Sequence, residues 1–159
     1  MSSSSGSAPD FSTRIAFGPV TVADFEELVA LRIAAMRESL ERLGRFDPER
    51  ARERLRQSFH PEHTAFIVYD GRRVGFYTFR PDEDGLHLDH LYIHPNDQGR
   101  GIGSHVLRQL LAQSEARALP VTVTALRGSA SNRFYRRHGF VPGSEEEWDI
   151  HYTYEPKVR

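Results

Sequence analysis

Three glycines stand at alternating positions in the loop Gln98–Ser104, between one apolar run before it and another after it. Glycine tolerates the backbone angles of a tight turn and is costly inside regular structure, so the spacing predicts a turn that opens a helix. This helix ends before Pro120, and Val121–Ala125 then alternates like a strand. With the strand-like run Leu86–Ile93 in front, the segment predicts a βαβ unit with parallel strands and a right-handed crossover. The apolar face of the helix consists of Ile102, Val106, Leu107, Leu110 and Leu111.

The run Leu86–Ile93 changes phase in its middle. Its apolar residues occupy even positions up to Leu88 and odd positions from Leu91 onward. Successive strand side chains point to opposite faces, so this offset predicts a β-bulge around Asp89 and His90. A bulge leaves backbone groups unpaired and bends the strand away from its neighbour.

Shorter signals place the other elements. Thr21 with Asp24 three residues later predicts a helix that stops at Gly44, and Asp47 followed by Pro48 predicts a second helix. The remaining runs predict strands at Thr13–Gly18, Thr64–Tyr69, Arg73–Arg80, Phe140-Val141 and Asp149–Tyr154, a hairpin turn at Asp70-Gly71, and a short helix at Ser131–His138. The predicted fold class is α+β, with a mixed, mostly antiparallel twisted sheet, a central βαβ unit and a bulged, splayed strand.

The glycine loop presents several backbone N–H groups in one direction at a helix N-terminus, where such a nest binds phosphate. A Walker A loop needs lysine and then serine or threonine after its last glycine, and these do not follow Gly103 in that form. The dinucleotide fingerprint needs a glycine where Ser104 stands and an acidic residue about 20 positions later. The remaining alternative is that the glycines only shape a turn.

The composition narrows the class of protein. The chain has 159 residues, 38% of them apolar and none of them cysteine. We expect one domain at 13–159, without disulfides, thiolate metal sites or acyl-cysteine intermediates. With a formal charge of −1, the chain has no strong net charge that would attract it to nucleic acid or to an anionic membrane. Residues 1–12 are expected to be a disordered or expression-derived tail, and the absence of a signal peptide favours the cytoplasm.

Two segments carry a resemblance to a known family. Gln98–Gly103 (QGRGIG) matches the Q/R-x-x-G-x-G/A signature of the GNAT superfamily of N-acetyltransferases, and Leu91–Pro95 (LYIHP) precedes it as expected. Phe134–Phe140 (FYRRHGF) is similar to the family's F/L-Y-x-x-x-G-F segment. Together with the bulged strand and the chain length, these motifs make the chain resemble a GNAT N-acetyltransferase from about Ile15 to Tyr154, with a GNAT-like sheet.

The resemblance implies acetyl-CoA as the donor. In such proteins the glycine loop holds the pyrophosphate, and the pantetheine arm pairs with the backbone of the bulged strand. The family often has an asparagine where this chain has Gly128, so Ser129, Ser131 or Asn132 must replace that contact, or it is absent. The residues assigned to coenzyme A in this way are Leu91, Tyr92, Ile93, Gln98, Gly99, Arg100, Gly101, Ile102, Gly103, Ser104, Asn132 and Tyr135.

The expected chemistry is direct transfer in a ternary complex, because no cysteine can carry the acetyl group. A neutral amine attacks the thioester, a backbone N–H near the bulge stabilises the oxyanion, and the leaving thiolate, with a pKa of about 8.5, gains from a proton donor. By the resemblance Tyr135 is that donor; the alternative is that it only packs against the cofactor. His87 and Asp89 are the candidate bases, unless Asp89 merely bonds the backbone at the bulge and His87 is a surface imidazole.

Two other charged patterns are weaker signals. His87, His90 and His94 suggest a zinc site, but His87 and His90 should face opposite ways on a strand, so we expect no metal. The basic run of the second predicted helix alternates with Glu49 and Glu53, which indicates a solvated face and not a phosphate track; it consists of Arg50, Arg52, Arg54 and Arg56.

The acceptor site is expected at the two predicted helices, their connection Arg45–Asp47 and the last hairpin. Arg32, beside the apolar stripe of the first helix, either holds an acidic group of the acceptor or extends to solvent. A polyamine, an amino acid, an aminoglycoside, a protein N-terminus and a lysine all stay possible acceptors.

Three functions follow from these features. The first is N-acetyltransferase activity toward an amine, the second a non-catalytic sensor or interaction module that binds coenzyme A, and the third an enzyme of nucleoside triphosphates. The terminal strand Asp149–Tyr154 is expected to leave an open edge that pairs with a second copy in a homodimer.

Overall fold

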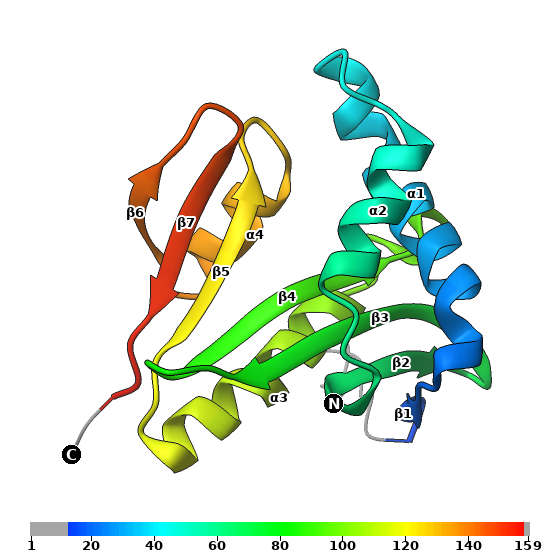
Figure 1. The fold of residues 1–159 in the computed structure, drawn as a ribbon. Helices are drawn as coiled ribbons and strands as arrows, with labels where there is room; N and C mark the ends of the chain where they lie inside the picture. The colour runs from blue at the N-terminus through cyan, green and yellow to red at the C-terminus, as the bar shows by residue number, and fades with distance from the viewer. Residues whose placement is uncertain (1–12, 158–159) are drawn as a thin grey trace, which may run out of the picture.

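The computed structural model describes residues 13–157, and its centre is a seven-stranded sheet with the order β1-β2-β3-β4-β5-β7-β6 (Figure 1). The strands are β1 (Ile15–Pro19), β2 (Thr64–Tyr69), β3 (Arg72–Pro81), β4 (Leu86–Ile93), β5 (Val121–Leu126), β6 (Val141–Glu145) and β7 (Asp149–Tyr154). The helices are α1 (Phe25–Arg42), α2 (Pro48–Gln57), α3 (Ile102–Arg117) and α4 (Ser131–Arg137), with 3-10 turns at Val22–Asp24, Pro61–His63 and Pro95–Asp97. The tail predicted at 1–12 lies outside the described residues.

The sheet has the predicted mixed topology. β4 and β5 are parallel and are connected through α3, whereas the other strand pairs are antiparallel. The α+β class and the central βαβ unit are therefore confirmed. Because β4 and β5 are parallel neighbours, their C-terminal ends lie on the same side of the sheet. The glycine loop that follows β4 lies on this side.

The predicted bulge is present on β4. Thr78 of β3 pairs with His90, and Phe79 pairs with Leu88, so the backbone of Asp89 has no pairing partner on β3. On the other edge of β4, the pairing with β5 reaches only to Leu88. The two strands then diverge, as Figure 1 shows. The phase change in the sequence thus marks the point where the sheet splits.

Helices cover both faces of the sheet. Phe66 and Ile67 are neighbours on β2 but belong to different hydrophobic clusters, one under α1 and α2 and the other under α3. The predicted apolar face of α3 is buried as a whole: Ile102, Val106, Leu107, Leu110 and Leu111. Burial of such a side chain is worth about 1.5–3 kcal/mol. This face therefore holds α3 on the sheet and keeps its N-terminus beside the end of β4.

The local start and stop signals act as predicted with one difference, which is that Thr21 begins the 3-10 turn Val22–Asp24 and α1 follows it from Phe25. The Asp24 carboxylate accepts the backbone N–H of Thr21 at 2.8 Å, and the Asp47 carboxylate accepts two backbone N–H groups of α2 at 3.0 and 3.3 Å. Gly44, with a φ of +69°, follows the end of α1, and the Asp70-Gly71 turn joins β2 to β3. Within residues 13–157 no helix combines the length and the apolar character that a membrane crossing requires.

The terminal strand differs from the prediction. β7 lies between β5 and β6, so the expectation that Asp149–Tyr154 forms an open edge is wrong, and with it the argument for a homodimer. The edge strand at this end of the sheet is β6, which extends the predicted Phe140-Val141 to Glu145 and has all its residues exposed; Phe140 itself is buried. The full length of β6 could not be predicted because it contains a proline and a glycine, which are unfavourable inside strands. Both residues are typical of strands at the edge of a sheet.

Candidate active site

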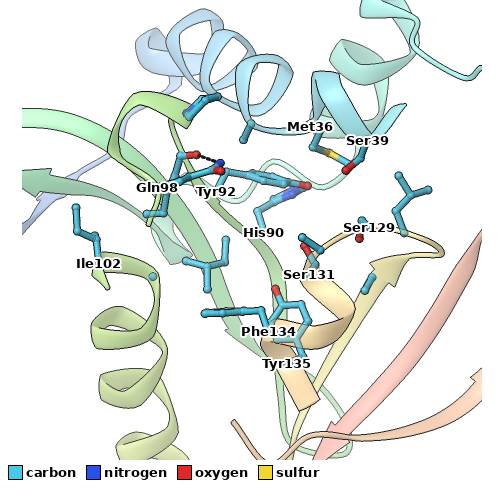
Figure 2. Close-up of a pocket in the computed structure, with 18 of the residues that line it drawn as sticks. Met36, Ser39, His90, Tyr92, Gln98, Ile102, Ser129, Ser131, Phe134 and Tyr135 are labelled. Carbon is cyan, nitrogen blue, oxygen red and sulfur yellow. Dashed lines mark hydrogen bonds between the residues drawn. The ribbon is translucent and has the colours of Figure 1, made fainter. Parts of the chain in front are cut away.

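A cavity of about 600 Å³ opens where β4 and β5 diverge. Its wall comes from the C-terminal half of α1, from β4 beyond the bulge, from the glycine loop and the start of α3, and from the segment that leads from β5 into α4. In Figure 2, Met36, Tyr92, Ser131 and Tyr135 lie around this space. Its size falls among pockets that hold small-molecule ligands, about 300–1,000 Å³.

The glycine loop forms one end of the cavity. Gly99 and Gly101 have φ angles of +80° and +86°, and Gly101 is the N-cap of α3. The first N–H groups of a helix have no acceptors within the helix, and the first turn of α3 carries no acidic side chain. Gly103 and Ser104 of this turn line the cavity, whereas the predicted Arg100 is not part of its wall. The loop can therefore hold an anion through backbone groups.

The end of β4 forms the floor between the loop and the bulge. Leu91, Tyr92 and Ile93 line the cavity in the part of β4 that no longer pairs with β5. A strand edge without a neighbour can pair with the amides of an extended ligand. Gln98 donates from Nε2 to the carbonyl of Ile93 at 2.8 Å, drawn as a dashed line in Figure 2, and so ties the loop to this strand.

The predicted substitutes for the missing asparagine fall into two groups. Asn132 donates to the carbonyls of Leu126 and Ser129 at 2.9 and 3.0 Å and accepts the Tyr152 hydroxyl at 2.8 Å. Its amide thus holds the connection between β5 and α4, and Asn132 is not part of the cavity wall. Ser129 and Ser131 do line the cavity, and Figure 2 shows both beside it.

Tyr135 enters the cavity from α4. Its ring packs against Phe134, Phe140 and Tyr152 with centroid distances of 5.4, 5.3 and 6.3 Å, and Figure 2 shows its hydroxyl directed into the cavity. Burial raises the pKa of the Tyr135 phenol, and the nearby Tyr92 raises it further. The hydroxyl therefore keeps its proton at neutral pH, as a hydrogen-bond or proton donor must.

The two predicted bases form one ionic network at the bulge. Asp89 accepts from Arg80 at 2.5 and 3.2 Å and lies 3.2 Å from Nε2 of His87, whose Nδ1 is 2.6 Å from the Thr122 hydroxyl. Burial pushes the pKa of Asp89 upward, but the hydrogen bonds of His87 and Arg80 pull it down to about 2. Asp89 lines the cavity and stays ionised. His87 does not line it, and both its ring nitrogens have partners.

His90 lies in the cavity wall, which the prediction overlooked. Its Nε2 is 2.9 Å from the hydroxyl of Ser58, its buried Nδ1 has no partner among the described residues, and its ring lies 5.6 Å from that of Tyr92. Burial, together with the charge of Arg32, lowers the pKa of His90 to about 3. The phase change of the apolar pattern in Leu86–Ile93 could have predicted this position, because it turns the His90 side chain toward α1 and α2.

The three histidines considered for zinc each have other partners. His87 contacts Asp89 and Thr122, His90 contacts Ser58, and Nδ1 of His94 accepts a backbone N–H at 3.1 Å. In the described part of the chain, no three residues of the metal-binding types gather closely enough to hold an ion.

A second cavity of about 190 Å³ adjoins the first on the side of α1 and α2. The residues that line both cavities are Met36, Asp89, His90, Tyr92, Thr124 and Leu126. Its other walls come from α1, the connection to α2, α2 itself and the start of β7, and they include Arg32, Arg45, Arg50 and Arg54. These are the elements in which the sequence places the acceptor site.

Arg32 does not extend to solvent. It is only 7% exposed, donates from Nη1 to the carbonyl of Ala51 at 2.9 Å, and lines the second cavity. The basic run of α2 divides between two faces. Arg52 pairs with Glu26 and Arg56 pairs with Glu53, in agreement with a solvated face, whereas the other two arginines of the run line the cavity.

Comparison with protein families identifies one that fits the sequence. The profile of the acetyltransferase (GNAT) domain matches residues 61–142, which are 82 of the 159 residues. The match contains the bulged strand, the glycine loop and the Tyr135 segment. No curated protein matches the chain in sequence.

Solved structures share the fold at low sequence identity. The PaiA N-acetyltransferase of Thermoplasma acidophilum, solved in complex with coenzyme A, is 15% identical with a TM-score of 0.71, and the match covers 89% of this chain and 98% of that one. The ribosomal-protein-S18-alanine N-acetyltransferase of Escherichia coli is 14% identical with a TM-score of 0.68, over 91% and 96% of the two chains. An acetyltransferase of Thermus thermophilus is 16% identical with a TM-score of 0.69, over 89% and 97%.

Proposed function

The chain belongs to the acetyltransferase (GNAT) family, and from this premise we propose that it transfers an acetyl group from acetyl-CoA directly to an amine while both substrates are bound. The observation that carries the proposal is the cavity between the diverging strands, which has an anion-binding helix start at one end and the Tyr135 hydroxyl within its wall. We expect the acceptor amine to enter from the second cavity, which shares a wall with the first.

The residues of the first cavity suit coenzyme A. The backbone N–H groups of Gly103 and Ser104 would bind the pyrophosphate, because the helix start adds partial positive charge. The amides of the pantetheine arm would pair with Leu91 and Ile93 where β5 has left the edge of β4. Ser129 or Ser131 would provide the side-chain contact that the family's asparagine makes. The coenzyme A in the related Thermoplasma structure supports this donor.

The transfer needs a nucleophilic nitrogen and a leaving group that tolerates charge. The amine nitrogen bonds to the acetyl carbon, the carbon–sulfur bond breaks, and the sulfur leaves as a thiolate. Tyr135 donates its hydroxyl hydrogen to that sulfur. Because the pKa of Tyr135 lies above its usual value and that of a thiol is about 8.5, the hydrogen bond stabilises the thiolate before the proton is fully transferred.

The nitrogen must also lose two protons: the acceptor ammonium loses one before the attack, and the nitrogen loses the second as the thiolate leaves, which replaces the proton that Tyr135 gives to the sulfur. Asp89 lines both cavities and stays ionised, so it can attract and orient the acceptor ammonium, while the proton that the ammonium loses passes through water to the solvent. With a pKa of about 2 it is a weak base, so its main contribution is to position the amine. His87 then acts on Asp89, which it contacts at 3.2 Å, and not on the acceptor.

A thiol-release assay with acetyl-CoA and a panel of amines tests the function. We expect Tyr135→Phe to lower kcat at least about a hundredfold, the lower end of the range for loss of a proton donor, with the affinity for coenzyme A nearly unchanged. Tyr154→Phe is the matched control, because the Tyr154 hydroxyl bonds Glu115 outside the cavity. Loss of rate and affinity together would make Tyr135 a packing residue.

The same assay separates the alternatives. Tight binding of coenzyme A without thiol release from any amine would favour a non-catalytic sensor or interaction module. Preference for ATP over coenzyme A in a titration would favour an enzyme of nucleoside triphosphates. The glycine loop is the single feature that supports this alternative.

A further inference from the structure

The second cavity is lined by more positive than negative charge. Its arginines are Arg32, Arg45, Arg50 and Arg54, and its carboxylates are Asp47, Asp89 and Asp149. Asp47 accepts the first N–H groups of α2, and Asp89 is held by Arg80 and His87, neither of which lines this cavity. Two of the three carboxylates are therefore held by backbone N–H groups or by side chains other than those of the four arginines.

Arg32 is a buried cation without a carboxylate. Its side chain is 7% exposed, and its one hydrogen bond among the described residues goes to the neutral carbonyl of Ala51. Its buried Nε has no partner in that part of the chain. A desolvated charge of this kind is costly unless an anion faces it. The cavity beside Arg32 is the place from which such an anion can approach.

Two further arginines extend this positive surface. Arg50 and Arg54 are one helical turn apart on α2, so they share a face, and both line the cavity. Neither forms an ion pair with a described residue, whereas Arg52 and Arg56 on the other side of the helix pair with glutamates. The positive charge of α2 is thus neutralised on its outer face and left open toward the cavity.

We propose that the second cavity binds the acceptor through an anionic group, a carboxylate or a phosphate, so that the acceptor is a small amine that also carries an acid group. The inference rests on the proposed acetyl transfer. The acid group lies against Arg32 and Arg54, and the amine points to Asp89 on the wall shared with the first cavity. A volume of about 190 Å³ suits a molecule of amino-acid size, and the arginines repel a polycation.

Matched acceptor pairs test the proposal by thiol release. We compare each common amino acid with its carboxamide, phosphoethanolamine with ethanolamine, and include spermidine. We expect kcat/KM to be at least about tenfold higher for the acid-bearing member, the value of one charged hydrogen bond, and the two kinds of pair distinguish carboxylate from phosphate. Equal or better use of the uncharged members or of spermidine overturns the proposal but leaves acetyl transfer intact. No thiol release with any amine overturns both.

Variants locate the effect in this cavity. Arg54→Ala, at an exposed position, should raise KM for the acid-bearing acceptor about tenfold and leave the KM for acetyl-CoA unchanged. Arg32→Gln should raise the same KM by a similar factor, and an unchanged affinity of this variant for coenzyme A serves as the control that it is folded. Arg56→Ala, on the outer face of the same helix, is the control and should change neither value. If the preference for acid over carboxamide survives in both Arg54→Ala and Arg32→Gln, the proposal is wrong.

Discussion

His90 shows how one buried side chain can make the whole fold sensitive to acid. The ring is 7% exposed between α2 and the sheet, and one of its nitrogens has no partner among the described residues. An imidazolium there would lose its water and be repelled by Arg32, and the attraction of Asp89 does not offset these effects, so the pKa of His90 is held at about 3. The folded protein therefore keeps this histidine neutral over the range in which an unfolded chain protonates it.

We predict a loss of stability between pH 6.5 and 5. The pKa of His90 is lower in the folded state than in the unfolded state, about 3 against about 6.5, so the unfolded chain binds the extra proton below pH 6.5. The free energy of unfolding should fall by about 1.6 kcal/mol between these two pH values, because the slope grows toward about 1.4 kcal/mol per pH unit as the unfolded histidine becomes fully protonated. Urea unfolding at both pH values measures it.

His90→Gln is the matched variant for this effect. Glutamine keeps a polar group near Ser58 but does not titrate, so the difference in unfolding free energy between pH 6.5 and pH 5 should shrink by most of that amount. An unchanged difference would assign the acid sensitivity to other groups. The partly exposed His151, which pairs with Glu146, provides a control substitution that should leave the difference unaltered.

At the scale of elements, the junction between β4 and α3 combines two local features. The bulge at Asp89 ends the pairing with β5, and the left-handed Gly101 begins α3. Neither feature forms a site alone. The unpaired edge of β4 can form a binding site because the buried face of α3 holds the N-terminus of that helix beside it. An extended ligand with a phosphate at one end meets both features at once.

We predict that Gly101→Ala weakens coenzyme A binding. Gly101 has a φ of +86°, a conformation that costs an alanine about 1 kcal/mol or more, so the start of α3 should shift. We expect the Kd for coenzyme A to rise about tenfold in calorimetry, with the fold retained. Gly44→Ala is the control, since Gly44 has a φ of +69° at the end of α1, outside the cavity. Equal effects of both variants on Kd would mean that the loop does not bind the pyrophosphate.

At the scale of the whole molecule, the split sheet forms two parts. β1 to β4 with α1 and α2 lie on one side of the opening, β5, β6, β7 and α4 lie on the other, and α3 packs across the sheet behind them (Figure 1). The pairing of Leu86–Leu88 with Val121–Val123 is the ladder between the two parts of the sheet. A ligand between the diverging strands contacts both parts.

We therefore predict that coenzyme A stabilises the whole fold against heat. At 100 times its Kd a ligand adds about 2.7 kcal/mol, which corresponds to a rise in Tm of about 5–10 °C for a domain of this size. Scanning calorimetry with and without coenzyme A measures the shift, and ATP at the same concentration should give a smaller one. A larger shift with ATP would contradict the assignment of the cavity.

Features that depend on near neighbours in the chain could be predicted from the residues alone. The bulge, the glycine turns, the helix caps and the apolar face of α3 follow from residues within one or two turns of each other, because backbone sterics and side-chain periodicity act over that distance. The GNAT-like topology and the position of the cavity could be predicted for the same reason, since the motifs at the glycine loop and at Tyr135 are themselves short.

Partners far apart in the chain became known only from the folded molecule. Asn132 accepts the hydroxyl of Tyr152, Arg32 donates to the carbonyl of Ala51, and Asp89 accepts from Arg80. These hydrogen bonds span 20, 19 and 9 residues of the chain. A side chain uses whatever donor or acceptor packing places beside it, and no local pattern encodes that choice. For the same reason, the strand that covers β7 and the arginines that face the second cavity emerged from tertiary packing.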